Sequence, residues 1–259
     1  MNILSIKNLT KYFGDRKVID NLTLSIEQGE IFGLIGTNGA GKTTTINCMA
    51  DLIDYDKGNI KIFNRFLKND AIYIKQNIGI LFENNDDLFV HLKGEEHLQF
   101  VGEIYGLKKV EIERRIDELF NFFEINDDRY KLIETYSKGM RKKISLASIL
   151  LHNPEFIILD EPFDGLDTLT VIKVKKLLKQ LKAKGKTTLI TSHILSYIED
   201  LADEVAIINK GEIIYQAATK DIRGKVKNEL TKETYQSLEE IFIDLTAEKE
   251  DQNKTLSWL

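Results

Sequence analysis

The chain has 259 residues, of which 42% are hydrophobic and 30% are charged, and its formal net charge is −5. This composition supports a sizeable core, yet no apolar run approaches the roughly 18 residues of a membrane-spanning helix. The acidic balance argues against a dedicated nucleic-acid-binding protein. The opening residues lack the basic segment and apolar core of a signal peptide. The single cysteine, Cys48, cannot form an internal disulfide, which suits a reducing compartment.

The first third of the chain carries the pattern of a β-rich segment around a glycine-rich loop. Alternating apolar and polar residues predict strands at 3–6, 22–26 and 30–35. The glycine-rich loop follows directly, at 36–41, and a helix is expected from 42 to about 51. Two further strands are predicted at 60–63 and 78–81.

The middle of the chain changes to helical spacing. Helices are predicted at 94–105 and 110–123, each with one apolar face, and a third helix at 139–152 follows Ser137. The apolar faces are formed by Leu98, Val101 and Tyr105 in the first helix and by Ile112, Ile116, Leu119 and Phe123 in the second. Residues from about 85 to 153 are therefore interpreted as a helical insert within an α/β frame.

The last third returns to alternating strands and helices. Elements are predicted at 156–160, 169–183, 187–191, 195–201, 205–209 and 212–215, beginning with a buried strand and ending with a strand pair. A short amphipathic helix is predicted at 237–245, and the polar end of the chain is expected to be mobile. The chain is thus divided into a domain at 1–219 and a C-terminal extension at 220–259.

The glycine-rich loop matches the pattern GxxxxGKT, between an apolar strand and a helix. Glycines let the backbone wrap a phosphate, and successive N–H groups at a helix start hold the anion. The lysine is expected to reach the β- and γ-phosphates, and the threonine to offer its hydroxyl to Mg²⁺. A chance glycine-rich turn is disfavoured by the flanking strand and helix. The predicted phosphate-binding residues are Gly36, Thr37, Asn38, Gly39, Ala40, Gly41, Lys42, Thr43 and Thr44.

Two carboxylates follow the apolar strand at 156–159. Asp160 is suited to hold Mg²⁺, and Glu161 is expected to emerge on the other side of the strand and polarise an attacking water. The alternative for an Asp-Glu-Pro sequence is an ordinary exposed turn. The phosphate-binding loop upstream favours the catalytic interpretation.

A third motif, Tyr136-Ser137-Lys138-Gly139-Met140, lies just upstream of the two carboxylates. It resembles the LSGGQ signature, and the chain is identified on these three ordered motifs as a member of the ATP-binding cassette family. Tyr, Lys and Met replace Leu, the first Gly and Gln, while the Ser-x-Gly centre is intact. Ser137 is a natural N-cap. The resemblance implies that Ser137 and Gly139 close over the ATP bound by a partner subunit.

Further positions resemble motifs of the same family. Residues 163–167 resemble the D-loop, which lies across the dimer interface, and His193 resembles the switch histidine that touches the γ-phosphate. Phe13 aligns with the aromatic that stacks on adenine, with Tyr12 as its rival and a core aromatic as the other alternative. Val18 is expected to line the same adenine-binding face. Glu83 stands where the family usually has glutamine, and its carboxylate could bind Mg²⁺ or orient water.

The resemblance implies a P-loop NTPase core with a mixed sheet, an N-terminal antiparallel β-subdomain and an inserted α-helical subdomain. It also implies ATP and Mg²⁺ as cofactors, and catalytic roles for Lys42, Glu161 and His193. The partners implied are a second copy or a paralogous ATPase subunit and a separate membrane permease, with no nucleic acid. The chain would then be cytoplasmic, on the inner face of the cell membrane.

The residues at 238–242 resemble the C-terminal segment of ABC-2 type exporter subunits, which favours export. Two alternatives are retained. One is a cassette ATPase that acts on ribosomes or DNA, and the other is a module that binds ATP without hydrolysing it. The 94 residues between Lys42 and Ser137 leave no room for a long coiled coil, and the catalytic residues are intact, so both are disfavoured.

Overall fold

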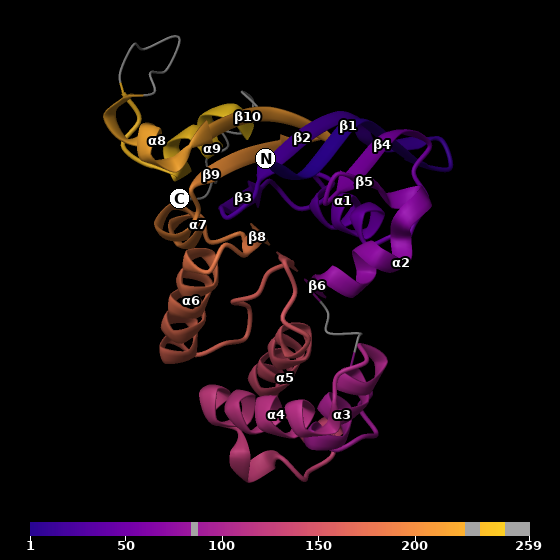
Figure 1. Cartoon of the computed structure of the whole chain (residues 1–259). Helices are drawn as coiled ribbons and strands as arrows, with labels where there is room; N and C mark the ends of the chain where they lie inside the picture. The colour runs from indigo at the N-terminus through magenta and orange to yellow at the C-terminus, as the bar shows by residue number, and fades with distance from the viewer. Residues whose placement is uncertain (84–87, 226–233, 247–259) are drawn as a thin grey trace, which may run out of the picture.

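The computed structural model describes residues 1–83, 88–225 and 234–246 (Figure 1). Within these residues the chain forms two sheets with helices around them. One is a four-stranded antiparallel sheet in the order β2-β1-β4-β5. Its strands are β1 (Asn2–Phe13), β2 (Arg16–Glu27), β4 (Lys57–Ile62) and β5 (Arg65–Phe66).

The second sheet has six strands in the order β10-β9-β3-β8-β7-β6. All neighbours are parallel except β9 and β10, so the predicted mixed sheet is confirmed. Its central strands are buried along their whole length, which is typical of strands covered on both faces. The strands are β3 (Ile31–Ile35), β6 (Ile78–Leu81), β7 (Phe156–Leu159), β8 (Thr187–Thr191), β9 (Glu204–Asn209) and β10 (Glu212–Ala218).

The register of the parallel strands gathers their carboxyl ends at one edge. Leu34 pairs with Thr191, and Leu159 pairs with Ile190. The segments that follow β3, β7 and β8 therefore leave the sheet side by side. Ligands of open α/β sheets bind in the crevice beyond these ends, so this edge is where the site is expected.

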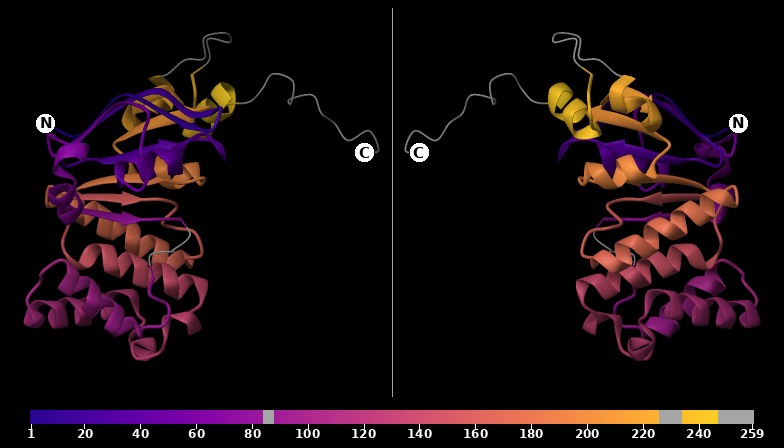
Figure 2. Two further views of the ribbon diagram at one scale, coloured as in Figure 1. Left: turned by 90° about the vertical axis from the view of Figure 1, so that its right-hand side faces the viewer. Right: turned by 90° about the vertical axis from the view of Figure 1, so that its left-hand side faces the viewer.

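Three helices form a separate group at one end of the molecule, as both views in Figure 2 show. They are α3 (Gly94–Ile104), α4 (Lys109–Phe123) and α5 (Lys138–Leu151). Two short 3₁₀ helices, η1 (Asn126–Asp128) and η2 (Ile133–Thr135), connect α4 to α5. Leu98, Ile112, Ile116 and Phe123 of the predicted apolar faces are buried in the core of this helical subdomain, together with Phe120, which was not predicted. The other predicted members, Val101, Tyr105 and Leu119, are only partly buried.

The remaining helices flank the sheets. They are α1 (Lys42–Met49), α2 (Leu67–Asn77), α6 (Thr168–Ala183), α7 (Leu195–Leu201), α8 (Thr219–Lys225) and α9 (Leu238–Thr246). The C-terminal helix α9 packs against α7. No helix in the described part of the chain is long and apolar enough to cross a membrane. Residues 85–87 of the predicted insert and the predicted mobile tail from 247 onward lie outside the described residues.

Several elements differ from the sequence-based expectations. Strands β1 and β2 have 12 residues each, far longer than the predicted 3–6 and 22–26. Their register shifts at β-bulges, and Asn8 has a left-handed backbone (φ 51°), so the alternation of apolar and polar residues is broken. Among the described residues, five elements were not predicted at all: α2, β5, η1, η2 and α8.

Candidate nucleotide-binding site

The glycine-rich loop joins the buried strand β3 to α1, as the motif predicted. Its backbone requires glycine at two positions, because Gly39 and Gly41 have φ of 77° and 113°. Gly36 is required for a different reason. A Cβ atom there would lie 2.4 Å from the carbonyl oxygen of Ile208 on β9. The loop is therefore shaped by its neighbours into a turn that exposes backbone N–H groups at the start of α1.

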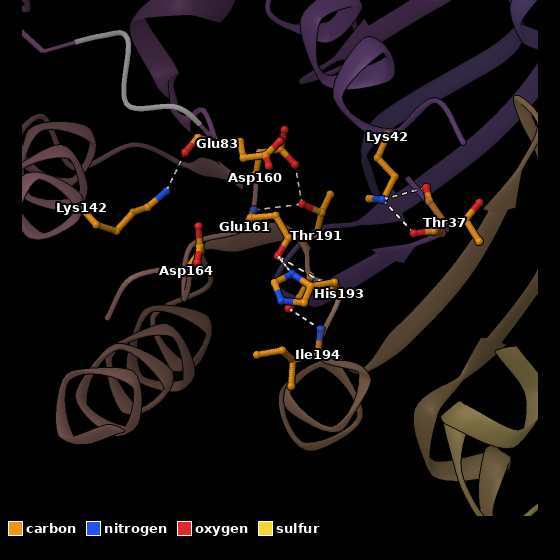
Figure 3. A network of polar contacts seen from close by, with 12 residues as sticks. Thr37, Lys42, Glu83, Lys142, Asp160, Glu161, Asp164, Thr191, His193 and Ile194 are labelled. Atoms are coloured by element: carbon orange, nitrogen blue, oxygen red, sulfur yellow. Dashed lines mark hydrogen bonds and ion pairs between the residues drawn. The ribbon is translucent and has the colours of Figure 1, made fainter. Parts of the chain in front are cut away.

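Lys42 folds back over this loop. Its Nζ donates to the carbonyl of Gly36 at 2.8 Å and to the carbonyl of Thr37 at 3.2 Å (Figure 3). The side chain is only 9% exposed, so both bonds form where water competes poorly. The ammonium is thus held directly at the loop where a phosphate group would be bound.

Asp160 follows β7 and is 1% exposed. One of its oxygens accepts a hydrogen bond from the hydroxyl of Thr43 at 2.9 Å, and the other accepts from the hydroxyl of Thr191 at 2.6 Å. The pairing of a hydroxyl and a carboxylate suits Mg²⁺, which takes few protein ligands and completes its shell with phosphate oxygens and water. In the described parts of the chain, no group of three or more His, Cys, Asp or Glu side chains is arranged so that it could hold a metal ion.

Glu161 is held from three directions and is nearly buried, at 9% exposed. Its backbone is left-handed (φ 49°), which is uncommon for a residue other than glycine. Its N–H donates to the hydroxyl of Thr191 at 3.1 Å. Its carboxylate oxygen Oε2 accepts from the backbone N–H of His193 at 3.2 Å and lies 2.9 Å from the ring atom Nδ1 (Figure 3). The structure thus brings two predicted catalytic residues into direct contact.

The signature segment opens α5. Ser137 is its N-cap, and the Ser137 hydroxyl accepts from the backbone N–H of Met140 at 3.2 Å. Lys138, one of the departures from LSGGQ, forms an ion pair with Asp164 at 2.7 Å. This ammonium holds the pKa of Asp164 below its usual range. Gly139 lies against the backbone of Gly165, where a Cβ would meet the carbonyl oxygen at 2.8 Å. The signature therefore packs on the predicted D-loop of the same chain.

Glu83 is exposed just beyond the end of β6. Its carbonyl oxygen accepts from Nζ of Lys142 at 3.1 Å, which ties this position to α5 (Figure 3). Lys142 itself is fully buried. Sequence reasoning missed this lysine, whose only local signal was a polar residue within the apolar face of a helix. A role for Glu83 at the metal remains a prediction.

The predicted adenine-stacking residue is exposed. Phe13, at the end of β1, is 51% exposed, and Tyr12 beside it is 37% exposed. Both rings have a lysine within cation–π distance, Lys11 for Phe13 and Lys17 for Tyr12. These exposures exclude the core-aromatic alternative for Phe13. The carbonyl oxygen of Val18, on β2, lies 3.2 Å from the Cβ position of Gly41, which places that part of β2 beside the phosphate-binding loop.

Comparison with known proteins agrees with this geometry. The family model described as "ABC transporter" matches residues 19–164. The ABC transporter ATP-binding protein NatA of Bacillus subtilis (strain 168) is 34% identical over 231 residues, covering 88% of this chain and 94% of that protein. The Nod factor export ATP-binding protein I of Ralstonia nicotianae is 32% identical, covering 85% of this chain and 68% of that protein.

Solved structures give the same result. The structure of an ATP-binding subunit of an ABC transporter superposes with a TM-score of 0.85 at 30% identity, covering 94% of this chain and 99% of that one. The architecture of two sheets and a helical subdomain is therefore that of the P-loop cassette ATPases. The chain belongs to the ABC transporter family, as a subunit that binds and hydrolyses ATP.

Proposed function

We propose that the chain drives export through a separate membrane permease, by closing with a second ATPase subunit on two Mg·ATP and reopening after hydrolysis. The second subunit is another copy or a paralogue. The pair would lie on the inner face of the cell membrane, held there by the permease. The name of the Ralstonia relative, an export ATP-binding protein, supports the outward direction. The 2.9 Å pairing of Glu161 with His193 at the edge that carries Lys42 and Asp160 supports a site built for hydrolysis.

Each residue of the site has a role in this proposal. Lys42 and the loop N–H groups at 36–44 would hold the β- and γ-phosphates, and Phe13 would stack on the adenine beside Val18. Thr43 and Asp160, with Glu83, would hold Mg²⁺, which neutralises the phosphate charge. Glu161 would orient the attacking water, and His193 would donate a hydrogen bond to the γ-phosphate.

The partner subunit would complete each site. Ser137 and Gly139 open a helix of 14 residues whose first turn carries no acidic side chain, an arrangement that favours an anion. This supports a role for the signature segment at the γ-phosphate bound by the other subunit. ATP would then act as the bridge that holds the two subunits together.

A groove between the sheet and the helical subdomain suits the permease. A cavity of about 360 Å³ opens there, and most of its lining is apolar, including Leu52, Ile80, Phe82 and Val101. Leu52 is 61% exposed, and Phe100 and Ile104 on α3 are also exposed. Exposed apolar patches mark interaction sites, and Leu52 is the exposed apolar residue of this lining. We propose that a short amphipathic helix of the permease docks in this groove, beside β6 and Glu83.

The test uses the full chain and a permease with about six spanning segments encoded beside it. ATP hydrolysis would be measured with the two proteins in liposomes, together with their co-purification. Leu52→Asp should abolish co-purification and the stimulation of hydrolysis by the permease. Ile172→Asp is the matched control, because Ile172 is 57% exposed but lies on α6, away from the groove (Figure 1). Loss of co-purification in both variants, or in neither, would contradict the docking site.

A further inference from the structure

We propose that Thr191 is a positioning residue for hydrolysis, whose hydroxyl fixes Asp160 and Glu161 relative to each other. The inference rests on the proposed roles of these two carboxylates. Thr191 is the last residue of β8 and is fully buried. Its Oγ1 donates to Asp160 at 2.6 Å and accepts from the N–H of Glu161 at 3.1 Å. A single hydroxyl, used as donor and as acceptor, therefore joins two consecutive residues.

The need for this bond follows from where the sheet ends. The N–H of Asp160 still donates to a backbone carbonyl, that of Leu81, at 2.9 Å. One residue later the backbone turns into the left-handed region at Glu161, and the N–H points at a side chain instead. Such a conformation persists only where the surroundings hold it. The Thr191 hydroxyl supplies the acceptor that the sheet no longer offers.

The direction of the hydrogen bond between Thr191 and Asp160 follows from the chemistry of the two groups. An ionised carboxylate can only accept, so the hydroxyl of Thr191 must donate to Asp160. The other oxygen of Asp160 accepts from Thr43. Both oxygens are thereby anchored, and the polar chain runs from Thr43 through Asp160 and Thr191 to Glu161. The proposed metal site and the proposed water-orienting carboxylate are connected through this one side chain.

The segment that carries Thr191 also holds the far end of Glu161. His193, two residues on, contacts the carboxylate through its backbone N–H and its ring. The end of β8 and the residues just after it thus contact Glu161 at both its N–H and its carboxylate. Removing the hydroxyl should leave ATP bound but shift Glu161 out of line with the γ-phosphate. Because misplacing a reacting group by about 1 Å can cost 10²-fold, we expect the rate to fall about tenfold or more.

The experiment compares Thr191→Val with Thr191→Ser and Thr188→Val in the full chain. Val removes the hydroxyl at nearly the same shape, and Ser retains it. Thr188 is the matched control, because it lies on the same strand, is 1% exposed, and has a hydroxyl without a hydrogen-bond partner among the described residues. ATP binding, kcat, KM for ATP and the Mg²⁺ dependence of turnover are measured for each.

Thr191→Val should lower kcat about tenfold or more and raise the Mg²⁺ concentration for half-maximal rate, while KM for ATP changes little. The kcat of Thr191→Ser should stay within about threefold of that of the unmodified chain. The kcat of Thr188→Val should equal that of the unmodified chain. If Thr191→Val does not fold, Thr191→Cys, a weak hydrogen-bonding residue of similar size, takes its place. Unchanged kcat and Mg²⁺ dependence in the Val or Cys variant, or equal loss in the Ser variant, would overturn the proposal.

Glu161→Gln in the same assay separates the two levels of inference. If the unmodified chain turns over ATP and Glu161→Gln does not, the proposed function stands whatever Thr191→Val does. If Glu161→Gln turns over ATP normally, the proposed role of Glu161 fails first. The positioning role of Thr191 then fails with it.

Discussion

Nδ1 of His193 lies 2.9 Å from Oε2 of Glu161, and the backbone N–H of His193 donates to the same oxygen. The two residues come from segments 32 positions apart, after β8 and after β7. In this arrangement the carboxylate that should orient water is occupied by the residue that should contact the γ-phosphate. Turning the imidazole toward a phosphate would remove the ring contact and leave the backbone N–H of His193 as the remaining contact of that residue with Oε2. We therefore expect nucleotide binding to change how Glu161 is held.

The first prediction concerns the charge of Glu161. Glu161→Gln keeps the size of the side chain and removes its ability to polarise water. Turnover should fall by about 10²–10⁴-fold, the range that a general base contributes, while ATP binding is retained. Because ATP then persists between the subunits, the variant should form a stable dimer in ATP. Phosphate release and size-exclusion chromatography with light scattering measure both effects, and retained hydrolysis would refute the assigned role.

The second prediction concerns Lys42, which in this structure bonds the carbonyls of Gly36 and Thr37. Charge-assisted hydrogen bonds to phosphate contribute about 1.5–3 kcal/mol, so Lys42→Ala should weaken ATP binding by roughly 10- to 150-fold. Lys42→Arg should not restore it, because a planar fork does not fit a loop shaped for an ammonium. Calorimetry measures the affinity, and at the same ATP concentration the ATP-induced rise in Tm should be smaller in the Ala variant. A Tm rise equal to that of the unmodified chain would contradict this role.

The sequence indicated the site residues that belong to contiguous motifs. It did not indicate the contacts between residues that are far apart in the chain. The loop at 36–44 and the carboxylates after β7 were found because each motif is contiguous and lies next to an apolar strand. Thr191 was read only as the end of a strand, since its two partners are 31 and 30 residues away. Likewise Lys138 was seen as a departure from LSGGQ, whereas its ion pair with Asp164 joins two separate motifs.

The same distinction explains the missed helix α2. Only Leu67 and Ile74 of its 11 residues are buried, and Asp70 has a non-helical backbone that kinks it. Ile72 and Tyr73 are exposed, so its apolar residues do not follow a helical period. The three helices of the insert have continuous buried faces, and their existence was predicted correctly. Whether a segment such as α2 becomes helical depends on its packing against neighbouring elements, and the spacing of its apolar residues does not indicate that packing.

The third prediction concerns the joint between the signature and the D-loop. In an open helix Gly139→Ala would stabilise by about 0.5–1 kcal/mol. Here the new Cβ would meet the carbonyl oxygen of Gly165 at 2.8 Å, so the D-loop must move away. Turnover should fall about tenfold, because displacement of the loop predicted to face the dimer interface would misplace the proposed site. Phosphate release and urea denaturation measure the two effects.

The matched control for Gly139→Ala is Gly102→Ala. Gly102 is also helical, but the three atoms nearest to its Cβ would be side-chain atoms of Ile112, within the helical subdomain. This control should change the free energy of unfolding and leave turnover per folded molecule unchanged. If Gly139→Ala gains stability and keeps full turnover, the contact between the signature and the D-loop has no functional weight.

The last prediction concerns His97, which is 1% exposed in α3. The hydroxyl of Ser148 donates to the carbonyl of Ile144, so it accepts from Nε2 of His97 at 2.9 Å. The other ring nitrogen, Nδ1, then has no hydrogen-bond partner among the described residues. Burial lowers the pKa of this imidazole from 6.5 to about 4. The folded chain therefore keeps His97 neutral, and its protonation is disfavoured by an unpaired buried N–H.

The sign of the pH effect follows from this lowered pKa. The unfolded chain binds the proton near pH 6.5 and the folded chain only near pH 4. The stabilisation is complete above pH 6.5 and is lost as the pH falls from 6.5 toward 4, reaching about 2 kcal/mol of loss at pH 5. His97→Gln should flatten the fall in unfolding free energy between pH 7.5 and 5 by this amount. His91→Gln, at a histidine 87% exposed, should leave the fall unchanged. Urea denaturation at several pH values gives the comparison, and equal slopes in all three proteins would refute the assignment.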